Sequence, residues 1–355
     1  MNMLKYLLFL PFLINCFISC SSKNKKSRQP VTKISISPVK RKIISGEQLT
    51  IDVKTRLKNG TLNKSTLYLD ERPIHTSDKA EYTIQLSTDT LKVGSHQIKV
   101  IAVKEDGLQG TNFKPFILNS NINPKLLKYK VEKTLWHDHN HFTQGLEIED
   151  GYMYESTGEN GKSGIFKYKI GQKKVLKSVP LPEQYFGEGI TIFNDKIYQV
   201  TYHAKKGFVY NLDNFAKVDS FAYANREGWG LTHNSHQIIM SDGSHKLTYF
   251  DPATMKKVKE LQVYDNKGPV LQLNELEYID GYIWANIWMS DVIVKIDPKT
   301  GKVVAKLYLM DLPVNISADD TERNVLNGIA WDKKAKKMYI TGKLWKEMFQ
   351  IKVIE

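Results

Sequence analysis

The segment GYIWANI (residues 281–287) belongs to a set of five similar short strands that decide the fold. Its counterparts are GYMYEST (151–157), DKIYQVT (195–201), HQIIMSD (236–242) and KKMYITG (336–342). The spacings are 44, 41, 45 and 55 residues between the equivalent positions Met153, Ile197, Ile238, Ile283 and Met338. Repeats of about 45 residues built from consecutive strands are typical of β-propeller blades. Five repeats therefore predict an all-β fold with a five-bladed β-propeller over residues 125–355.

Residues 31–122 show another pattern, in which hydrophobic and polar residues alternate and turns recur about every ten residues. Examples are LTIDV (49–53) and YTIQL (82–86). Six or seven short strands of this kind predict a small β-sandwich. The run LKVGSHQIKVIAVKEDG (91–107) resembles the late strands of bacterial immunoglobulin-like domains. No cluster of reactive side chains occurs in this region, so we expect an immunoglobulin-like spacer domain.

The first 20 residues have the features of an export signal. Lys5 precedes an apolar run that is too short for a stable transmembrane span. The ending FISC (17–20) resembles a bacterial lipobox, although Phe17 replaces the usual leucine. We therefore expect a lipoprotein signal peptide over residues 1–20, with lipidation of Cys20 and a solvated tether over residues 21–30. The prediction is an exported, lipid-anchored protein of the bacterial cell envelope, at its periplasmic or outer-membrane face.

Charge and cysteine content exclude several classes of protein. The net charge is +13, but nine basic side chains and no acidic ones lie in the first 42 residues. The excess charge is therefore mainly a property of the tail, and we expect no nucleic-acid partner. Cys16 and Cys20 are the only cysteines, so the mature chain can form neither an internal disulfide nor a cysteine-ligated zinc site.

Polar and aromatic motifs recur just before and on the repeated strands. In chain order they are HDHNHFTQGL (137–146), YESTG (154–158), YFGEGIT (185–191), EGWGLT (227–232), LNELEY (273–278), WANIW (284–288), LNGIAWD (326–332) and TGKLW (341–345). This ordered series resembles the propeller-type glutaminyl cyclases, a plant-type family that also occurs in bacteria. The resemblance covers nearly all of residues 130–355 and involves every repeat. It implies a glutaminyl-peptide cyclotransferase, which converts the N-terminal glutamine of peptides or proteins to pyroglutamate and releases ammonia.

Such a reaction needs a group that moves a proton from the attacking α-amine to the leaving nitrogen, and donors that hold the oxyanion. Glu188 lies between Gly187 and Gly189, where the backbone could approach a ligand closely, and it matches the family's proposed acid/base. The resemblance also places Asn274 and Lys343 at the site. We expect Asn274 to bind the amide oxygen, and Lys343 to bind the oxyanion or orient Glu188.

The resemblance further implies a substrate pocket. Phe142, Phe186, Trp229 and Trp288 match aromatic pocket positions, and Gln144 matches a residue that could bind the substrate amide or amine. The remaining tryptophans of the motifs are expected in the propeller core: Trp284, Trp331 and Trp345. Glu275 and Glu277 are expected to cap loops or to pair with Lys343 and its neighbours.

Metal binding is left open at two places. The alternating histidines His137, His139 and His141 could face one way and bind a divalent metal, or could form an ordinary polar loop. A propeller channel could also hold a structural calcium ion on carboxylates and carbonyl oxygens. The family's chemistry requires no cofactor, so no metal is assigned to the reaction.

Two alternative functions remain at this stage. A metal-dependent propeller hydrolase or lactonase would need several carboxylates to converge on the axis, for which Glu188, Glu275 and Asp242 are available. A non-enzymatic binding lipoprotein would use the propeller as a platform and the sandwich as a spacer. The polar members of the ordered motifs favour the cyclase, because they have no evident packing role.

Overall fold

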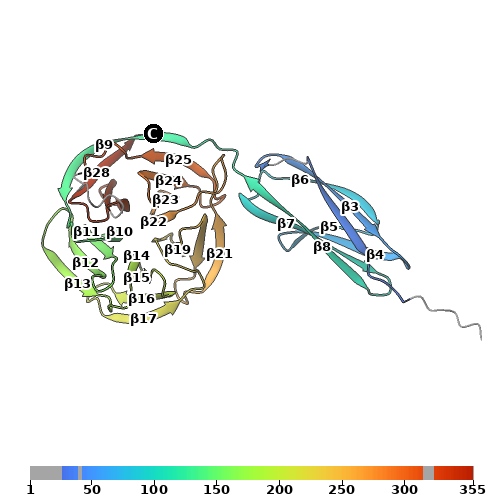
Figure 1. Cartoon of the computed structure of the whole chain (residues 1–355), viewed down its shortest axis with the longest axis horizontal. Helices are drawn as coiled ribbons and strands as arrows, with labels where there is room; N and C mark the ends of the chain where they lie inside the picture. The colour runs from blue at the N-terminus through green and yellow to red at the C-terminus, as the bar shows by residue number, and fades with distance from the viewer. Residues whose placement is uncertain (1–25, 39–41, 315–323, 355) are drawn as a thin grey trace, which may run out of the picture.

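A computed structural model describes residues 26–38, 42–314 and 324–354. These residues form strands, turns and loops without a helix, so no helix here could span a membrane. Figure 1 shows a ring of sheets joined to an elongated two-sheet domain. The predicted signal peptide, Cys20 and the first half of the tether lie outside the described residues.

The elongated domain contains a three-stranded sheet and a five-stranded sheet. The first has the order β1 (Val31–Ser37), β3 (Gln48–Arg56), β6 (Glu81–Ser87). The second has the order β2 (Ile43–Ile44), β8 (Gln109–Asn119), β7 (Gly94–Lys104), β4 (Leu62–Leu69), β5 (Arg72–Ser77). Alternate residues of β3 and β7 are buried, and Leu49, Ile51 and Val100 are fully enclosed in one core. Strands β3 and β7 thus bury one face against the opposite sheet, as the alternation predicted.

The ring contains three separate four-stranded sheets. They are β10 (Thr143–Glu149), β11 (Tyr152–Thr157), β12 (Gly164–Lys169), β13 (Val175–Pro180); β14 (Gly187–Phe193), β15 (Lys196–Thr201), β16 (Lys206–Asn211), β17 (Lys217–Ala222); and β18 (Leu231–His233), β19 (Ile238–Ser241), β20 (Lys246–Phe250), β21 (Lys257–Gln262). Burial falls from β10, whose residues are nearly all buried, to β13, which is mostly exposed. The first strand of each sheet is therefore the innermost one, as Figure 1 shows for β10, β14 and β22.

The last sheet has eight strands and closes the ring. Its order is β22 (Leu273–Ile279), β23 (Tyr282–Ile287), β24 (Val292–Ile296), β25 (Val303–Tyr308), β9 (Lys125–Trp136), β28 (Glu347–Ile354), β27 (Lys337–Gly342), β26 (Leu326–Asp332). Dividing it between β25 and β9 gives five four-stranded units in the described residues. The long strand β9 pairs with β28 at Lys128–Trp136 and with β25 at Lys125–Leu127. The repeat did not indicate this closure, because β9 precedes the first repeated strand.

The two domains are in contact. The buried Lys302 ammonium donates to Ser45 Oγ at 2.8 Å and to Asn121 Oδ1 at 3.0 Å. The Val93 N–H donates to the Thr300 carbonyl oxygen at 2.9 Å. The turn after β24 therefore contacts the sandwich domain, which lies on the outer side of the ring and not near its centre (Figure 1).

Candidate active site

A cavity of about 180 Å³ lies where the inner strands of the propeller begin. Ten residues line it: Phe142, Gln144, Phe186, Glu188, Tyr202, Trp229, Asn274, Trp288, Val325 and Lys343. All eight residues that the sequence proposed for catalysis and substrate binding are among them. Tyr202 and Val325 were not proposed; Tyr202 directly follows a repeated strand, whereas Val325 carries no chemical signal.

Irregular pairing at the start of the inner strands directs the polar side chains into the cavity. The register between the first and second strand shifts at Thr143/Gly145, Gly187/Ile190, Leu273/Leu276 and Leu326/Ile329. A β-bulge leaves a residue out of the ladder and re-aims its side chain. Gln144, Glu188, Asn274 and Asn327 occupy the four shifts, so the same distortion recurs at the start of four inner strands, and the first three of these side chains line the cavity.

The glycines of these motifs allow neighbouring inner strands to approach each other. The Gly189 N–H donates to the Trp229 carbonyl oxygen at 2.6 Å. A Cβ atom on Gly189 would lie 2.4 Å from the Leu231 backbone nitrogen. This corrects the expectation that Gly189 serves close approach to a ligand, because the crowding atoms belong to the next sheet.

Glu188 is a buried carboxyl group with one side-chain hydrogen-bond donor. Its exposed fraction is 4%, and its Oε1 atom accepts a hydrogen bond from Gln144 Nε2 at 3.1 Å. Burial raises its pKa well above the usual range of a glutamate; the charge of Lys343 opposes this rise, and Glu227 adds to it. A carboxyl group with a raised pKa can exchange a proton near neutral pH, which suits a proton shuttle.

Lys343 is a cation enclosed by the pocket. Its exposed fraction is 6%, and its Nζ atom lies over the Phe142 ring at 4.7 Å from the centroid. Burial lowers its pKa, and the nearby Glu188 carboxylate opposes that change. The quadrupole of the ring stabilises the ammonium in place of water. A cation in such a dry site interacts strongly with negative charge that develops beside it.

Gln144 is fixed by a residue that was not singled out as a site residue. Asn327 Nδ2 donates to Gln144 Oε1 at 3.1 Å and to the Thr143 carbonyl oxygen at 3.0 Å. Because the Gln144 oxygen is already an acceptor, its nitrogen must face Glu188. Gln144 thus orients the Glu188 carboxyl group and keeps one N–H for a substrate. Asn327 belongs to the LNGIAWD motif, so a signal for it was present.

Asn274 has an unsatisfied polar atom. It is 2% exposed, and its Oδ1 atom has no hydrogen-bond partner among the residues that the structure describes. A buried acceptor without a partner is costly, so this oxygen is suited to a substrate N–H. That Asn274 also donates to the substrate amide oxygen stays a prediction.

Aromatic side chains form the walls of the cavity. Trp229 and Trp288 meet edge to face, with centroids 5.5 Å apart, and Phe142 and Phe186 do the same at 6.0 Å. Trp288 is 37% exposed and therefore lies at the mouth. The rings leave little room for water and suit the methylene groups of a small side chain.

Comparisons with known proteins agree with this geometry. The family model described as glutamine cyclotransferase matches residues 110–353. The chain belongs to the glutamine cyclotransferase family. A relative from Arabidopsis thaliana named glutaminyl-peptide cyclotransferase is 39% identical over 219 residues, which are 61% of this chain and 68% of the relative. The crystal structure of Myxococcus xanthus glutaminyl cyclase matches with a TM-score of 0.61 and 29% identity, over 65% of this chain and 98% of that chain. A bacterial immunoglobulin domain model matches residues 30–100, which confirms the type of the N-terminal domain.

The carboxylates required by the hydrolase alternative do not gather in this member of the family. Glu188 lines the pocket, Glu275 accepts hydrogen bonds from the Leu146 and Ile329 N–H groups, and Asp242 accepts from Asn225. Among the described residues, only His137, His141 and Glu155 form a group of three His, Cys, Asp or Glu side chains able to share a metal. His139 is exposed and lies outside that group, so the alternating histidines do not act as one set.

Glu275 and Glu277 tie inner strands together and do not pair with Lys343. Glu277 accepts from the Trp331 N–H at 3.0 Å, as Glu275 does from Ile329 at 2.8 Å. Glu147, on β10, accepts from the Ile192 N–H at 2.8 Å. These links connect the inner strand of one four-stranded unit to the inner strand of another and stabilise the ring from inside. A structural calcium ion in the channel remains a prediction.

The buried glutamates predict that stability falls as pH rises. Burial raises the pKa of Glu147 from 4.5 to about 7. The folded state then binds more protons than the unfolded state between these values, so the free energy of unfolding decreases with rising pH in that window. The loss is on the order of 3 kcal/mol for this group alone.

Glu147→Gln should flatten this slope, since glutamine keeps an acceptor oxygen for the Ile192 N–H and removes the charge. Urea unfolding of both proteins at pH 5 and pH 7.5 measures the difference. Equal slopes in the two proteins would contradict the assignment. The exposed Glu183→Gln provides a control that should keep the wild-type slope.

Proposed function

We propose that this protein is a glutaminyl-peptide cyclotransferase that acts on peptides or proteins with an N-terminal glutamine. The observation that carries the proposal is the enclosed pocket in which Glu188, Lys343, Asn274 and Gln144 meet within aromatic walls. It supplies a proton-transfer group, a cation and oriented amide groups in a space suited to one small side chain.

In the proposed reaction the neutral α-amine attacks the side-chain amide carbon of the same residue. Its nitrogen forms a bond to that carbon, and the amide oxygen gains negative charge. The Lys343 ammonium stabilises this charge. The Glu188 carboxylate removes a proton from the attacking nitrogen and delivers it to the amide nitrogen. The carbon–nitrogen bond to that group then breaks, ammonia leaves, and the five-membered lactam remains.

Asn274 and the aromatic walls bind the substrate. The unsatisfied Asn274 Oδ1 atom accepts an N–H of the substrate, which replaces a missing hydrogen bond. The walls hold the glutamine side chain folded, so that amine and amide meet at reacting distance. No step of this scheme calls for a cofactor.

We also propose that the protein is exported and anchored to the membrane through lipidated Cys20, with the immunoglobulin-like domain as a spacer. This part rests on the sequence of residues 1–20 alone. Substrates would then be other exported proteins or peptides from outside the cell.

The function is tested by incubating the purified protein with a short peptide that begins with glutamine and following the loss of one ammonia by mass spectrometry. A matched peptide that begins with asparagine is the control, because closure would require a strained smaller ring. Acceleration of the glutamine peptide alone supports the proposal. If the protein does not accelerate the spontaneous reaction, the binding-platform alternative takes its place.

A further inference from the structure

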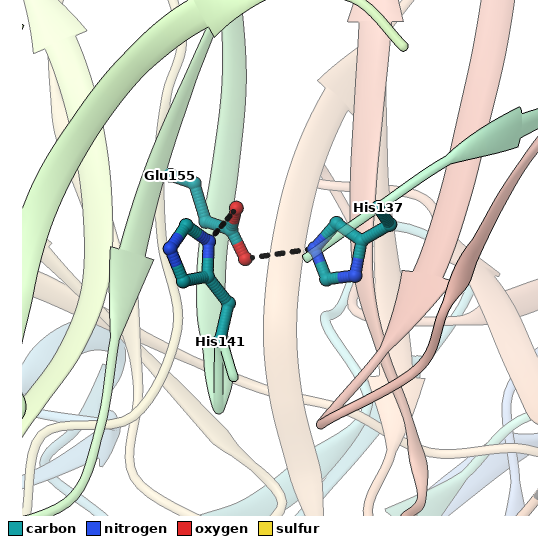
Figure 2. Close-up of side chains that lie close together, drawn as sticks. All are labelled: His137, His141 and Glu155. Atoms are coloured by element: carbon teal, nitrogen blue, oxygen red, sulfur yellow. Dashed lines mark hydrogen bonds and ion pairs between the residues drawn. The ribbon is translucent and has the colours of Figure 1, made fainter. Parts of the chain in front are cut away.

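Two histidines and a glutamate form a compact cluster outside the reaction pocket. His137 follows β9, His141 precedes β10, and Glu155 lies on β11. Figure 2 shows the two imidazole rings on either side of the Glu155 carboxylate. His137 Nε2 lies 3.0 Å from Oε1, and His141 Nδ1 lies 2.8 Å from Oε2. All three side chains are buried: His137 is 1% exposed, His141 8% and Glu155 0%.

We propose that His137, His141 and Glu155 bind one divalent transition-metal ion of the zinc class. One potential ligand atom from each side chain lies within 4.8 Å of the other two. Zinc takes nitrogen and carboxylate oxygen at about 2.0–2.2 Å, which puts neighbouring ligands roughly 3.4 Å apart in a tetrahedral site. Small side-chain movements would therefore bring the three ligands to that geometry, and water could take a fourth position.

His137 and Glu155 have outer hydrogen-bond partners that fix their orientation, and a carboxylate lies near the outer nitrogen of His141. His137 Nδ1 lies 2.8 Å from the Trp345 carbonyl oxygen, so the hydrogen on Nδ1 leaves Nε2 free to bind a metal. The two Glu155 oxygens accept hydrogen bonds from Thr143 Oγ1 and Tyr168 OH, each at 2.7 Å. His141 Nε2 lies 4.0 Å from Asp138 Oδ2. Ligands backed by carbonyl and carboxylate partners are typical of protein metal sites.

The hydrogen-bond inventory of His137 supports a cation. Both of its ring nitrogens face acceptors, namely the Trp345 carbonyl and the Glu155 carboxylate. A neutral imidazole has one N–H and can satisfy only one of them. The other contact needs an additional proton or a metal ion. Imidazole and carboxylate ligands without thiolate suit zinc and its neighbours in the first transition series.

The site would stabilise the wall of the pocket and take no part in bond making. Residues 137–142 connect β9 to β10; this segment carries Phe142 and leads directly to Gln144 on β10, and both side chains line the pocket. An ion held by His137, His141 and Glu155 would fasten this segment to β11. The inference thus goes beyond the proposed function, because no step of the cyclisation uses the ion.

Zinc binding is measured on protein prepared without a polyhistidine tag, stripped with a chelator and titrated with zinc alone in a calorimeter. We expect one zinc ion per chain. His141→Asn should weaken binding at least about 100-fold, since loss of an outer partner alone costs 10–100-fold. The matched control is His139→Asn, an exposed histidine of the same segment, which should bind zinc like the wild type.

Cobalt provides a test that needs no variant. Cobalt bound to the stripped wild-type protein should give the intense visible absorption bands of a four-coordinate site with nitrogen and oxygen ligands, and added zinc should displace the cobalt and remove these bands.

Saturating zinc should also raise the unfolding temperature of the wild type by about 5 °C, while chelation should leave cyclisation intact. Equal zinc affinity of wild type and His141→Asn, or a cobalt spectrum like that of the free ion, would overturn the proposal. Neither readout involves a peptide, so failure here is distinct from failure of the proposed function.

Discussion

Glu188→Gln is expected to lower kcat/KM for a glutamine peptide by roughly 10³-fold, within the range typical of general acid–base catalysis. Glutamine retains the shape of the side chain and an oxygen that can accept the hydrogen bond from Gln144. It cannot carry a proton between the two nitrogens of the substrate. Initial rates with purified wild type and variant, measured at several peptide concentrations, give the effect on kcat and KM separately.

The matched control is Glu277→Gln, which also replaces a buried inner-strand glutamate but does not line the pocket. We expect this variant to keep nearly wild-type turnover. If Glu188→Gln remains folded and nearly as active as the wild type, Glu188 is not the proton shuttle. Equal losses in both variants would indicate disruption of the ring instead of lost chemistry.

Lys343→Met should lower kcat by roughly 10²–10³-fold, the cost of removing one group that stabilises an oxyanion. Methionine fills similar space in a buried position, so the free energy of unfolding should not decrease. The exposed Lys346→Met, three residues later on the same segment, is the control and should retain wild-type activity.

The pH profile distinguishes an electrostatic role of Lys343 from a structural one. The Lys343 charge opposes the raised pKa of Glu188. Without it, that pKa rises further, and the acidic limb of kcat/KM moves to higher pH. The basic limb, where Lys343 loses its charge, should disappear. An unchanged profile with a reduced maximum would show that Lys343 acts only through packing.

Local sequence patterns were sufficient to predict the type of architecture. Alternation with a period of two makes strands, and a repeat of about 45 residues makes sheets of consecutive strands, because neighbouring strands joined by short turns pair with each other. Glu188 and Asn274 lie near the start of inner strands of two repeats and Lys343 directly follows the second strand of a third, and the resemblance to the glutaminyl cyclases assigned all three to the site. Their meeting in one pocket followed from the closed ring, without any knowledge of individual contacts.

Contacts between distant parts of the chain could not be read in this way. Gln144 forms hydrogen bonds with Glu188, which is 44 residues away in the sequence, and with Asn327, which is 183 residues away. The role of Gln144 in orienting Glu188 therefore depends on which residues the closed ring brings next to it. The reason for the motif glycines was likewise misassigned, since crowding by the next sheet is visible only in three dimensions. The bulges that aim these side chains leave no simple periodic signal.

The sequence by itself thus determined the type of the two domains, the positions of the repeated strands and eight of the ten residues that line the pocket. Tertiary structure alone decided that β9 closes the ring, that Glu275 and Glu277 bind backbone N–H groups, and that His141 joins His137 at Glu155 while His139 does not. The physical reason is that strand formation depends on near neighbours, whereas hydrogen-bond partners depend on the distances set when the whole ring closes.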